Sequence, residues 1–294
     1  GVVITFWFYL SDRYIPKIVG RAEYKKKKNH LFINSRISII LLIINHNTTL
    51  TMSLPKVLIP MSDYGHDPTE TAVPYHTFKT AGFSVHSATE TGGRPACDIK
   101  MLEGITQKLL GATQATASLY KEMSQTDVFT SPLSWSSESF FLKPYHLVFL
   151  PNNNEKGYWK GVKKPGKKCI GAVCHGVMVL SESMMEGNDG AEKKSIIHDC
   201  DTTSLPGMFE GMAYWSTRWV LGDYYKTYGA GSENVEASIM KRLDDPERQW
   251  KQYLLLNPFV VEDENYNYMS ARWPGDVQLL ADRLVDLVRE NVNN

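Results

Sequence analysis

Short runs of apolar residues, each ending in turn residues, recur along the chain after residue 52. Four such runs stand out: Lys56–Ser62, Phe83–Glu90, Tyr145–Asn152 and Lys167–Gly176. They contain mostly continuous apolar residues, and several of these are β-branched or aromatic. This pattern is typical of strands that are buried on both faces of a parallel sheet.

Segments with apolar residues at three-to-four spacing lie between and after these runs, and they predict helices. The expected helices are Glu70–Ala81, Met101–Leu110, Ala115–Met123, Val177–Glu186 and a last one that opens at Pro274-Gly275-Asp276 and continues to about Asn291. Gly82 follows the first helix at the position where a C-cap glycine is expected. Because strands and helices alternate, we predict an α/β fold, a flavodoxin-like three-layer α-β-α sandwich with a mostly parallel sheet.

The composition is that of an ordinary globular protein and excludes several classes. The 294 residues include 32 basic and 32 acidic side chains, so the net charge gives no reason to expect nucleic acid as a partner. The four cysteines have neither metal-ligand nor disulfide-framework spacing, which favours a reducing, cytoplasmic compartment and no bound metal. We expect residues 52–294 to form a single domain, with an inserted helical segment at about 97–140.

The first 51 residues differ in composition from the rest and are rich in Ile, Asn, Lys, Tyr and Phe. Their apolar stretch Ile37–Ile44 is too short for a membrane-spanning helix, which needs about 20 residues. They also lack the order of basic, apolar and small residues of a signal peptide. We expect translation to begin at Met52, which would make this leader a gene-model artefact. The alternative is a genuine leader that is disordered or associates with a membrane.

The sequence IGAVCHGVMVL, from Ile170 to Leu180, places a cysteine and a histidine between an expected strand and an expected helix. A nucleophile on such a turn projects its side chain at the carboxyl edge of the sheet, where chemistry collects in open α/β folds. The following helix would lower the pKa of a thiol at its N-terminus. Cys174 is therefore a candidate nucleophile and His175 a candidate acid or base. The alternative is a buried structural cysteine beside a core histidine.

Three segments resemble the ThiJ/PfpI superfamily, the class I glutamine amidotransferase-like fold. AVCHG resembles its nucleophile elbow, and SARWPGD, from Ser270 to Asp276, resembles the C-terminal segment of fungal members. The opening segment VLIPMSDYGHDPTETAVPYHTFKTAGFSV resembles the family's first strand and helix. In that segment Glu70, four residues before Pro74, matches the glutamate that contacts the thiol.

The resemblance also implies roles for acidic residues and for one loop. TTSLPGMFE, ending at Glu210, resembles the segment that ends in the acid that orients the histidine, with Asp223 as the second candidate. An alternative for both Glu70 and Glu210 is a purely structural position. The family usually has a Gly-Gly loop after its third strand that forms part of an oxyanion hole. This chain has asparagine at 152–154 instead, and the connection to the next strand is short.

Two functions remain open on these grounds. The heat-shock-31-like, glyoxalase III-like branch implies conversion of methylglyoxal to lactate without glutathione. Cys174 would attack the aldehyde, His175 would move the proton between carbons, and Glu70 and Glu210 would position groups. This chemistry needs no cofactor and only a small-molecule aldehyde as partner, without nucleic acid or membrane, and it is compatible with a homodimer. The alternatives are a stress-responsive holdase chaperone or cysteine redox sensor, or a catalytically impaired relative.

Overall fold

The structure is a computed structural model that describes residues 54–104, 107, 111–150, 158–185, 193–227, 229 and 231–293. The leader and the expected start at Met52 lie outside this part of the chain. The elements run in the order β1 Lys56–Pro60, β2 Tyr64–His66, α3 Pro68–Thr80, β3 Ser84–Thr89, β4 Ala96–Cys97, η1 Ile99–Met101, α5 Gln114–Met123, α6 Asp127–Thr130, β5 Leu133–Ser134, β6 Leu147–Leu150, η2 Trp159–Gly161, β7 Cys169–Val173, α7 Gly176–Glu182, α8 Gly207–Leu221, α9 Val235–Met240, α10 Pro246–Gln249, β8 Val260–Glu262, β9 Tyr268–Ala271, η3 Pro274–Asp276 and α11 Val277–Asn293.

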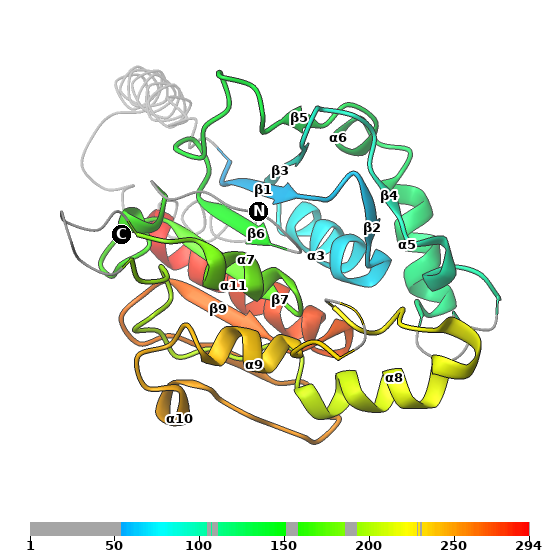
Figure 1. Ribbon diagram of the computed structural model, residues 1–294. Helices are drawn as coiled ribbons and strands as arrows, with labels where there is room; N and C mark the ends of the chain where they lie inside the picture. The colour runs from blue at the N-terminus through cyan, green and yellow to red at the C-terminus, as the bar shows by residue number, and fades with distance from the viewer. Residues whose placement is uncertain are drawn as a thin grey trace, which may run out of the picture. The chain divides into compact units, whose positions relative to one another are not determined.

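Seven strands form the main sheet in the order β5-β3-β1-β6-β7-β9-β8 (Figure 1). Neighbouring strands are parallel except at one edge, where β8 runs antiparallel to β9. The chain builds outward from β1 to β3 and β5, and then returns to the other side of β1 with β6. Strand order therefore reverses between β1 and β6, and ligands bind at such a switch point in open α/β sheets. The predicted fold, a mostly parallel sheet flanked by helices, is confirmed.

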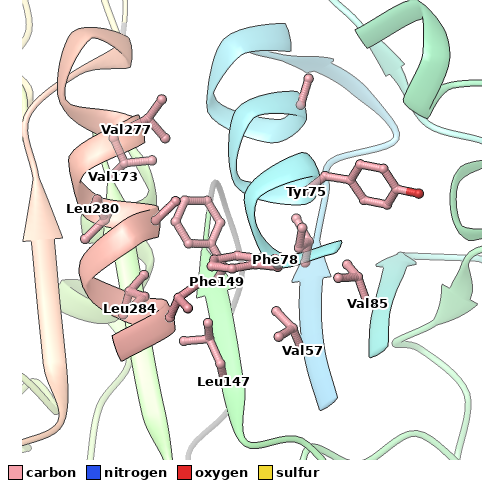
Figure 2. Close-up of a cluster of buried hydrophobic side chains, with 14 of the residues drawn as sticks. Val57, Tyr75, Phe78, Val85, Leu147, Phe149, Val173, Val277, Leu280 and Leu284 are labelled. Carbon is pink, nitrogen blue, oxygen red and sulfur yellow. The ribbon is translucent and has the colours of Figure 1, made fainter. Parts of the chain in front are cut away.

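One face of the sheet packs under α3 and α11. Val57, Leu147 and Phe149 point from neighbouring strands toward these helices, where Phe78 and Leu284 meet them (Figure 2). All five side chains are fully buried, because α11 presents a continuous apolar stripe to the strands and α3 adds large side chains such as Phe78. Burying side chains of this size stabilises the fold by about 1.5–3 kcal/mol each.

The alternate residues of the same strands face the opposite layer. Leu58, Val148 and Ile170 pack in a second cluster together with Leu180 of α7 and Ile239 of α9. Successive strand residues point to opposite faces, so a strand buried on both sides needs apolar residues at every position. This explains the continuous apolar runs, and it completes the three layers of the sandwich.

Element boundaries differ modestly from the sequence-based expectations. The strand expected at Tyr145–Asn152 is observed as the shorter strand β6. The helix expected at Val177–Glu186 ends four residues earlier, at Glu182. Half of the helix expected at Met101–Leu110 lies outside the described residues. The rest of the segment at 97–140 contains α5 and α6 but also the short edge strand β5, so it is not wholly helical.

Residues Leu54–Asn294 form one compact unit of the chain. None of the helices in the described part is both long enough and apolar enough to cross a membrane.

Candidate active site

Cys174 lies on a sharp turn between β7 and α7. Its φ is 54°, and it is the single non-glycine residue with positive φ in the described part of the chain, as a nucleophile on a strained turn requires. Such a conformation costs on the order of 1–3 kcal/mol and persists only where surrounding bonds hold it. Here the Cys174 N–H donates to the Ala271 carbonyl at 3.1 Å, and the Cys174 carbonyl accepts from the Ser204 hydroxyl at 2.7 Å.

A chain of polar contacts runs from the sulfur across His175. Nδ1 of His175 lies 3.3 Å from Cys174 Sγ, and Nε2 lies 3.0 Å from the Thr227 hydroxyl. That hydroxyl donates in turn to Glu210 Oε1 at 3.4 Å. Glu210 is only 3% exposed and also accepts from the backbone N–H of Val235 at 2.9 Å. The structure thus brings Glu210 to the site, but its contact with His175 is through Thr227 rather than direct.

Glu70 approaches the sulfur from the first turn of α3. Asp67 caps this helix by accepting from the N–H groups of Thr69 and Glu70, at 2.6 and 3.1 Å, and Pro68 follows at the first helical position. This start directs the Glu70 side chain inward, where it is 6% exposed and close enough to Cys174 for each group to influence the pKa of the other. The structure therefore brings the glutamate and the thiol together, although the two residues are far apart in sequence.

The acidities of these two groups are linked. Burial, reinforced by the charge of Asp67, raises the pKa of Glu70 well above its ordinary value. A Glu70 that keeps its proton at neutral pH can donate to the sulfur. Burial also raises the pKa of the Cys174 thiol, and the neighbouring Glu70 and Asp67 carboxylates add to this.

The expectation that the following helix lowers the pKa of the Cys174 thiol is therefore wrong. Its basis was the N-terminus of the following helix, but α7 has only seven residues and the sulfur is enclosed beside two acids. Burial raises the pKa of Cys169 to about 11, so a structural thiol in the strand is perturbed as well. Deprotonation of Cys174 consequently requires a nearby base.

His175 is placed to be that base. The surrounding protein lowers its pKa, and the charge of Glu210 only partly opposes this effect. The side chain still has accessible surface, which faces the cavity described next. A neutral imidazole 3.3 Å from the sulfur can accept the thiol proton.

The candidate site opens into a cavity of about 520 Å³. Besides Cys174, His175, Glu70 and Glu210, its lining includes side chains that sequence reasoning did not identify: His66, Asp98, Phe209, Tyr224, Tyr225 and Trp273. They come from loops and helix ends on several elements, so no local pattern marks them. The second candidate acid, Asp223, accepts from the Tyr214 hydroxyl at 3.4 Å and is not part of this lining.

The SARWPGD segment proves to be a structural clamp beside the cavity. Arg272 is fully buried and forms two 2.8 Å contacts with Asp276, while its remaining guanidinium N–H groups donate to the carbonyls of Tyr253, Leu255 and Asn257. A fully hydrogen-bonded guanidinium is needed because an unpaired buried charge is costly. The clamp fixes the chain on both sides of Trp273.

Two other expectations concern an oxyanion hole and metals. The asparagines at 152–154, where the family resemblance places backbone donors, lie outside the described residues. Among the residues that are described, no group of three or more His, Cys, Asp or Glu side chains is arranged to hold a metal ion.

The fold and this site define a class: three-layer α/β proteins with a cysteine on a strand-to-helix elbow. The chain belongs to the ThiJ/PfpI-like family, whose model matches residues 61–253. An uncharacterized protein of Schizosaccharomyces pombe is 28% identical over 240 residues, which are 79% of this chain and 84% of that protein.

Solved structures show a similar fold. Rapid Encystment Protein 24 KDa of Francisella tularensis is 17% identical, with a TM-score of 0.51 over 80% of this chain and 99% of that one. Glyoxalase III of Candida albicans is 15% identical, with a TM-score of 0.48 over 79% of this chain and 97% of that one.

Proposed function

We propose that this protein is a cysteine-dependent, glutathione-independent glyoxalase that converts a 2-oxoaldehyde such as methylglyoxal to the 2-hydroxy acid. The observation that carries the proposal is the arrangement around Cys174. A nucleophile on a strained elbow lies 3.3 Å from an imidazole nitrogen and beside a buried glutamate, at the wall of a cavity. These are the groups that covalent catalysis on a carbonyl requires.

The steps balance without an external oxidant or cofactor. His175 Nδ1 takes the thiol proton as Cys174 Sγ bonds to the aldehyde carbon, which gives a hemithioacetal. His175 passes the thiol proton to the oxygen of the hemithioacetal and then moves the hydrogen of that carbon, as a proton, to the adjacent carbon. The proton of the hemithioacetal hydroxyl moves to the oxygen of the adjacent carbon, so that carbonyl becomes a hydroxyl while the first carbon becomes a thioester. Water cleaves the thioester, releases the 2-hydroxy acid and restores the thiol. One carbon is oxidised and its neighbour is reduced, so the net reaction consumes only water.

The other residues have supporting roles in this proposal. A protonated Glu70 donates to the sulfur or to the substrate oxygen as charge develops there. Glu210 acts on His175 through Thr227. A carboxylate only accepts hydrogen bonds, so the Thr227 hydroxyl donates to Glu210 and accepts from His175 Nε2–H. This direction leaves His175 Nδ1 unprotonated and facing the sulfur, which is the tautomer a base needs.

The proposal is tested by lactate formation from methylglyoxal in the absence of glutathione. Wild type should form lactate, Cys174→Ala should form none above background, and Cys169→Ala should retain activity. Cys169 is a suitable control because it is a buried thiol of the same strand, outside the cavity lining. Equal activity in wild type and Cys174→Ala would refute the proposed role of the thiol.

A second candidate function, a holdase chaperone, is supported by the outer face of α8. Met208, Met212, Trp215 and Trp219 follow one another at helical spacing and are 47%, 62%, 63% and 87% exposed. An apolar stripe of this kind can bind unfolded chains. In this case Trp215→Ser with Trp219→Ser should abolish suppression of client aggregation, whereas Cys174→Ala should leave it unchanged.

A further inference from the structure

The cavity beside Cys174 is large for methylglyoxal, which has only three carbon atoms. Its volume of about 520 Å³ falls within the range of roughly 300–1,000 Å³ that is typical of sites for larger organic ligands. The binding free energy from apolar contact grows with the area of the cavity wall that the ligand covers. A ligand as small as methylglyoxal leaves most of the wall uncovered and gains little of this binding free energy.

The walls are strongly aromatic. Phe209 of α8 and Trp273 have ring centroids 5.2 Å apart, and Tyr224 and Tyr225 form an edge-to-face pair at 4.8 Å. All four residues line the cavity, and Leu205 and Met101 add aliphatic surface. Aromatic rings bind other rings through stacked or edge-to-face contacts, each worth about 0.5–1.5 kcal/mol beyond area burial.

Two polar atoms of the lining are buried without a hydrogen-bond partner in the described part of the chain: the Tyr225 hydroxyl and Nδ1 of His66. His66 is 6% exposed, and its Nε2 is already bonded to the Tyr120 hydroxyl at 3.0 Å. The Ser62 backbone lies near enough to influence the pKa of His66 but not in hydrogen-bond geometry with Nδ1. Unpaired buried polar atoms are costly, so their presence here points to a polar group of a ligand.

The charge of the lining restricts the ligand further. Carboxyl groups of Asp67, Asp98 and Glu210 line the cavity, and no lysine or arginine is found among the described lining residues. A carboxylate on the substrate would face these carboxyl groups with no cation among the described lining residues, and burying it unpaired is unfavourable. The same field favours departure of the anionic hydroxy acid that the reaction forms.

We propose that the preferred substrates are neutral 2-oxoaldehydes with a bulky aromatic or branched apolar group, and that methylglyoxal is a poor member of this class. This inference rests on the proposed function of Cys174, and the covalent steps are those given above. In the bound substrate the apolar group lies against the aromatic walls, and a polar substituent reaches Tyr225 or His66. Substrates with an additional carboxylate are rejected.

Turnover of matched aldehydes tests the proposal first. We expect kcat/KM for phenylglyoxal to exceed that for methylglyoxal at least tenfold, and 4-carboxyphenylglyoxal to react at least tenfold more slowly than phenylglyoxal. Phe209→Ala should lower the preference for phenylglyoxal, whereas Phe141→Ala should not. Phe141 is a matched control because it is 57% exposed and lies outside the lining. Equal or better use of methylglyoxal by wild type would overturn the inference.

Alkylation of Cys174 provides a readout that does not depend on turnover. Peptide mass spectrometry gives the rate at which Cys174 is alkylated by iodoacetanilide, by iodoacetamide and by iodoacetate. Each rate is divided by the rate of the same reagent with free N-acetylcysteine. We expect iodoacetanilide to be favoured and iodoacetate disfavoured, each at least fivefold relative to iodoacetamide. If these ratios are observed and neither aldehyde is consumed, the proposed glyoxalase activity is refuted, whereas the proposed ligand selectivity of the cavity is supported. Ratios equal to those of the free thiol would refute the inference even if methylglyoxal is consumed.

Discussion

Nε2 of His175 lies 3.0 Å from the Thr227 hydroxyl, so a threonine occupies the place where a direct carboxylate partner was expected. Thr227→Val keeps the shape of the side chain but removes the link to Glu210. We expect kcat to fall at least tenfold, because the histidine then loses its fixed tautomer. Thr227→Ser, which retains the hydroxyl, should stay within about threefold of wild type.

The pH profile separates this role from a merely structural one. The charge of Glu210 raises the pKa of His175, and Glu210→Gln removes that charge. The acidic limb of kcat/KM should therefore move to lower pH in Glu210→Gln and remain in place in Thr227→Ser. An unchanged limb together with unchanged kcat in the glutamine variant would assign Glu210 a structural role only.

The acidity of Cys174 is expected to depend on Glu70. When ionised, Glu70 and Asp67 raise the pKa of the thiol, so in the alkaline range where the thiol titrates Glu70→Gln, which cannot ionise, should lower that pKa. The midpoint of the iodoacetamide rate against pH should move to lower pH. Asp67→Asn keeps the helix cap and should shift the midpoint in the same direction by less. A midpoint that stays or rises in Glu70→Gln would contradict this electrostatic account.

His66 should make the fold sensitive to acid. Burial lowers its pKa from the ordinary 6.5 to about 4. Between these values the unfolded chain binds a proton that the folded protein does not, so stability is lost as pH falls from 6.5 toward 4. Between pH 7 and pH 5 this loss amounts to about 2 kcal/mol. The free energy of unfolding is measured by urea titration at both pH values for wild type and His66→Gln. The loss between the two pH values should be smaller in His66→Gln by that amount. An identical loss in both proteins would disprove the assignment to His66.

The buried clamp of Arg272 and Asp276 should be among the most sensitive structural contacts. Arg272→Met leaves the Asp276 carboxylate buried without its cation, and we expect a loss of about 3–5 kcal/mol in the free energy of unfolding. The Arg242–Glu182 pair at 2.7 Å is a matched control on the surface. Glu182→Gln should cost less than about 1 kcal/mol. Similar losses in the free energy of unfolding of the two variants, measured by urea titration, would show that the buried Arg272–Asp276 pair contributes no more to stability than a surface ion pair.

The parts of the fold that the sequence predicted are those encoded in local periodicity. β7 has a continuous apolar run because both of its faces are buried, and α11 has a long apolar stripe because one of its faces is buried. Both patterns can therefore be recognised in the sequence. The edge strand β5 has two residues, one of them exposed, and leaves no such pattern. The cysteine elbow was predictable for the same reason as β7, since the strand, turn and helix are adjacent in the chain.

The cavity and the electrostatics of the site were not predictable, because they depend on residues brought together by the fold. Thr227 and Tyr225 lie in a loop after α8 that has no periodic signal, and only the packing of α8 places them beside His175. The acidity of Cys174 was misjudged because its neighbours Glu70 and Asp67 are distant in the chain and outweigh the local turn. Glu210 lies beside the cavity, and its link to His175 through Thr227 is a three-dimensional relation that the sequence does not show.

The central claim is that Cys174 holds the substrate covalently while His175 carries a proton between its two carbons. The most direct measurement is the isotope content of lactate that wild type forms from methylglyoxal in D₂O, read by proton NMR at the carbon bearing the hydroxyl. Because His175 has accessible surface in the cavity, its proton exchanges with solvent, and we predict deuterium at that carbon in most of the product. Lactate that retains the aldehyde hydrogen there in full would indicate a direct hydride shift and contradict the role of His175.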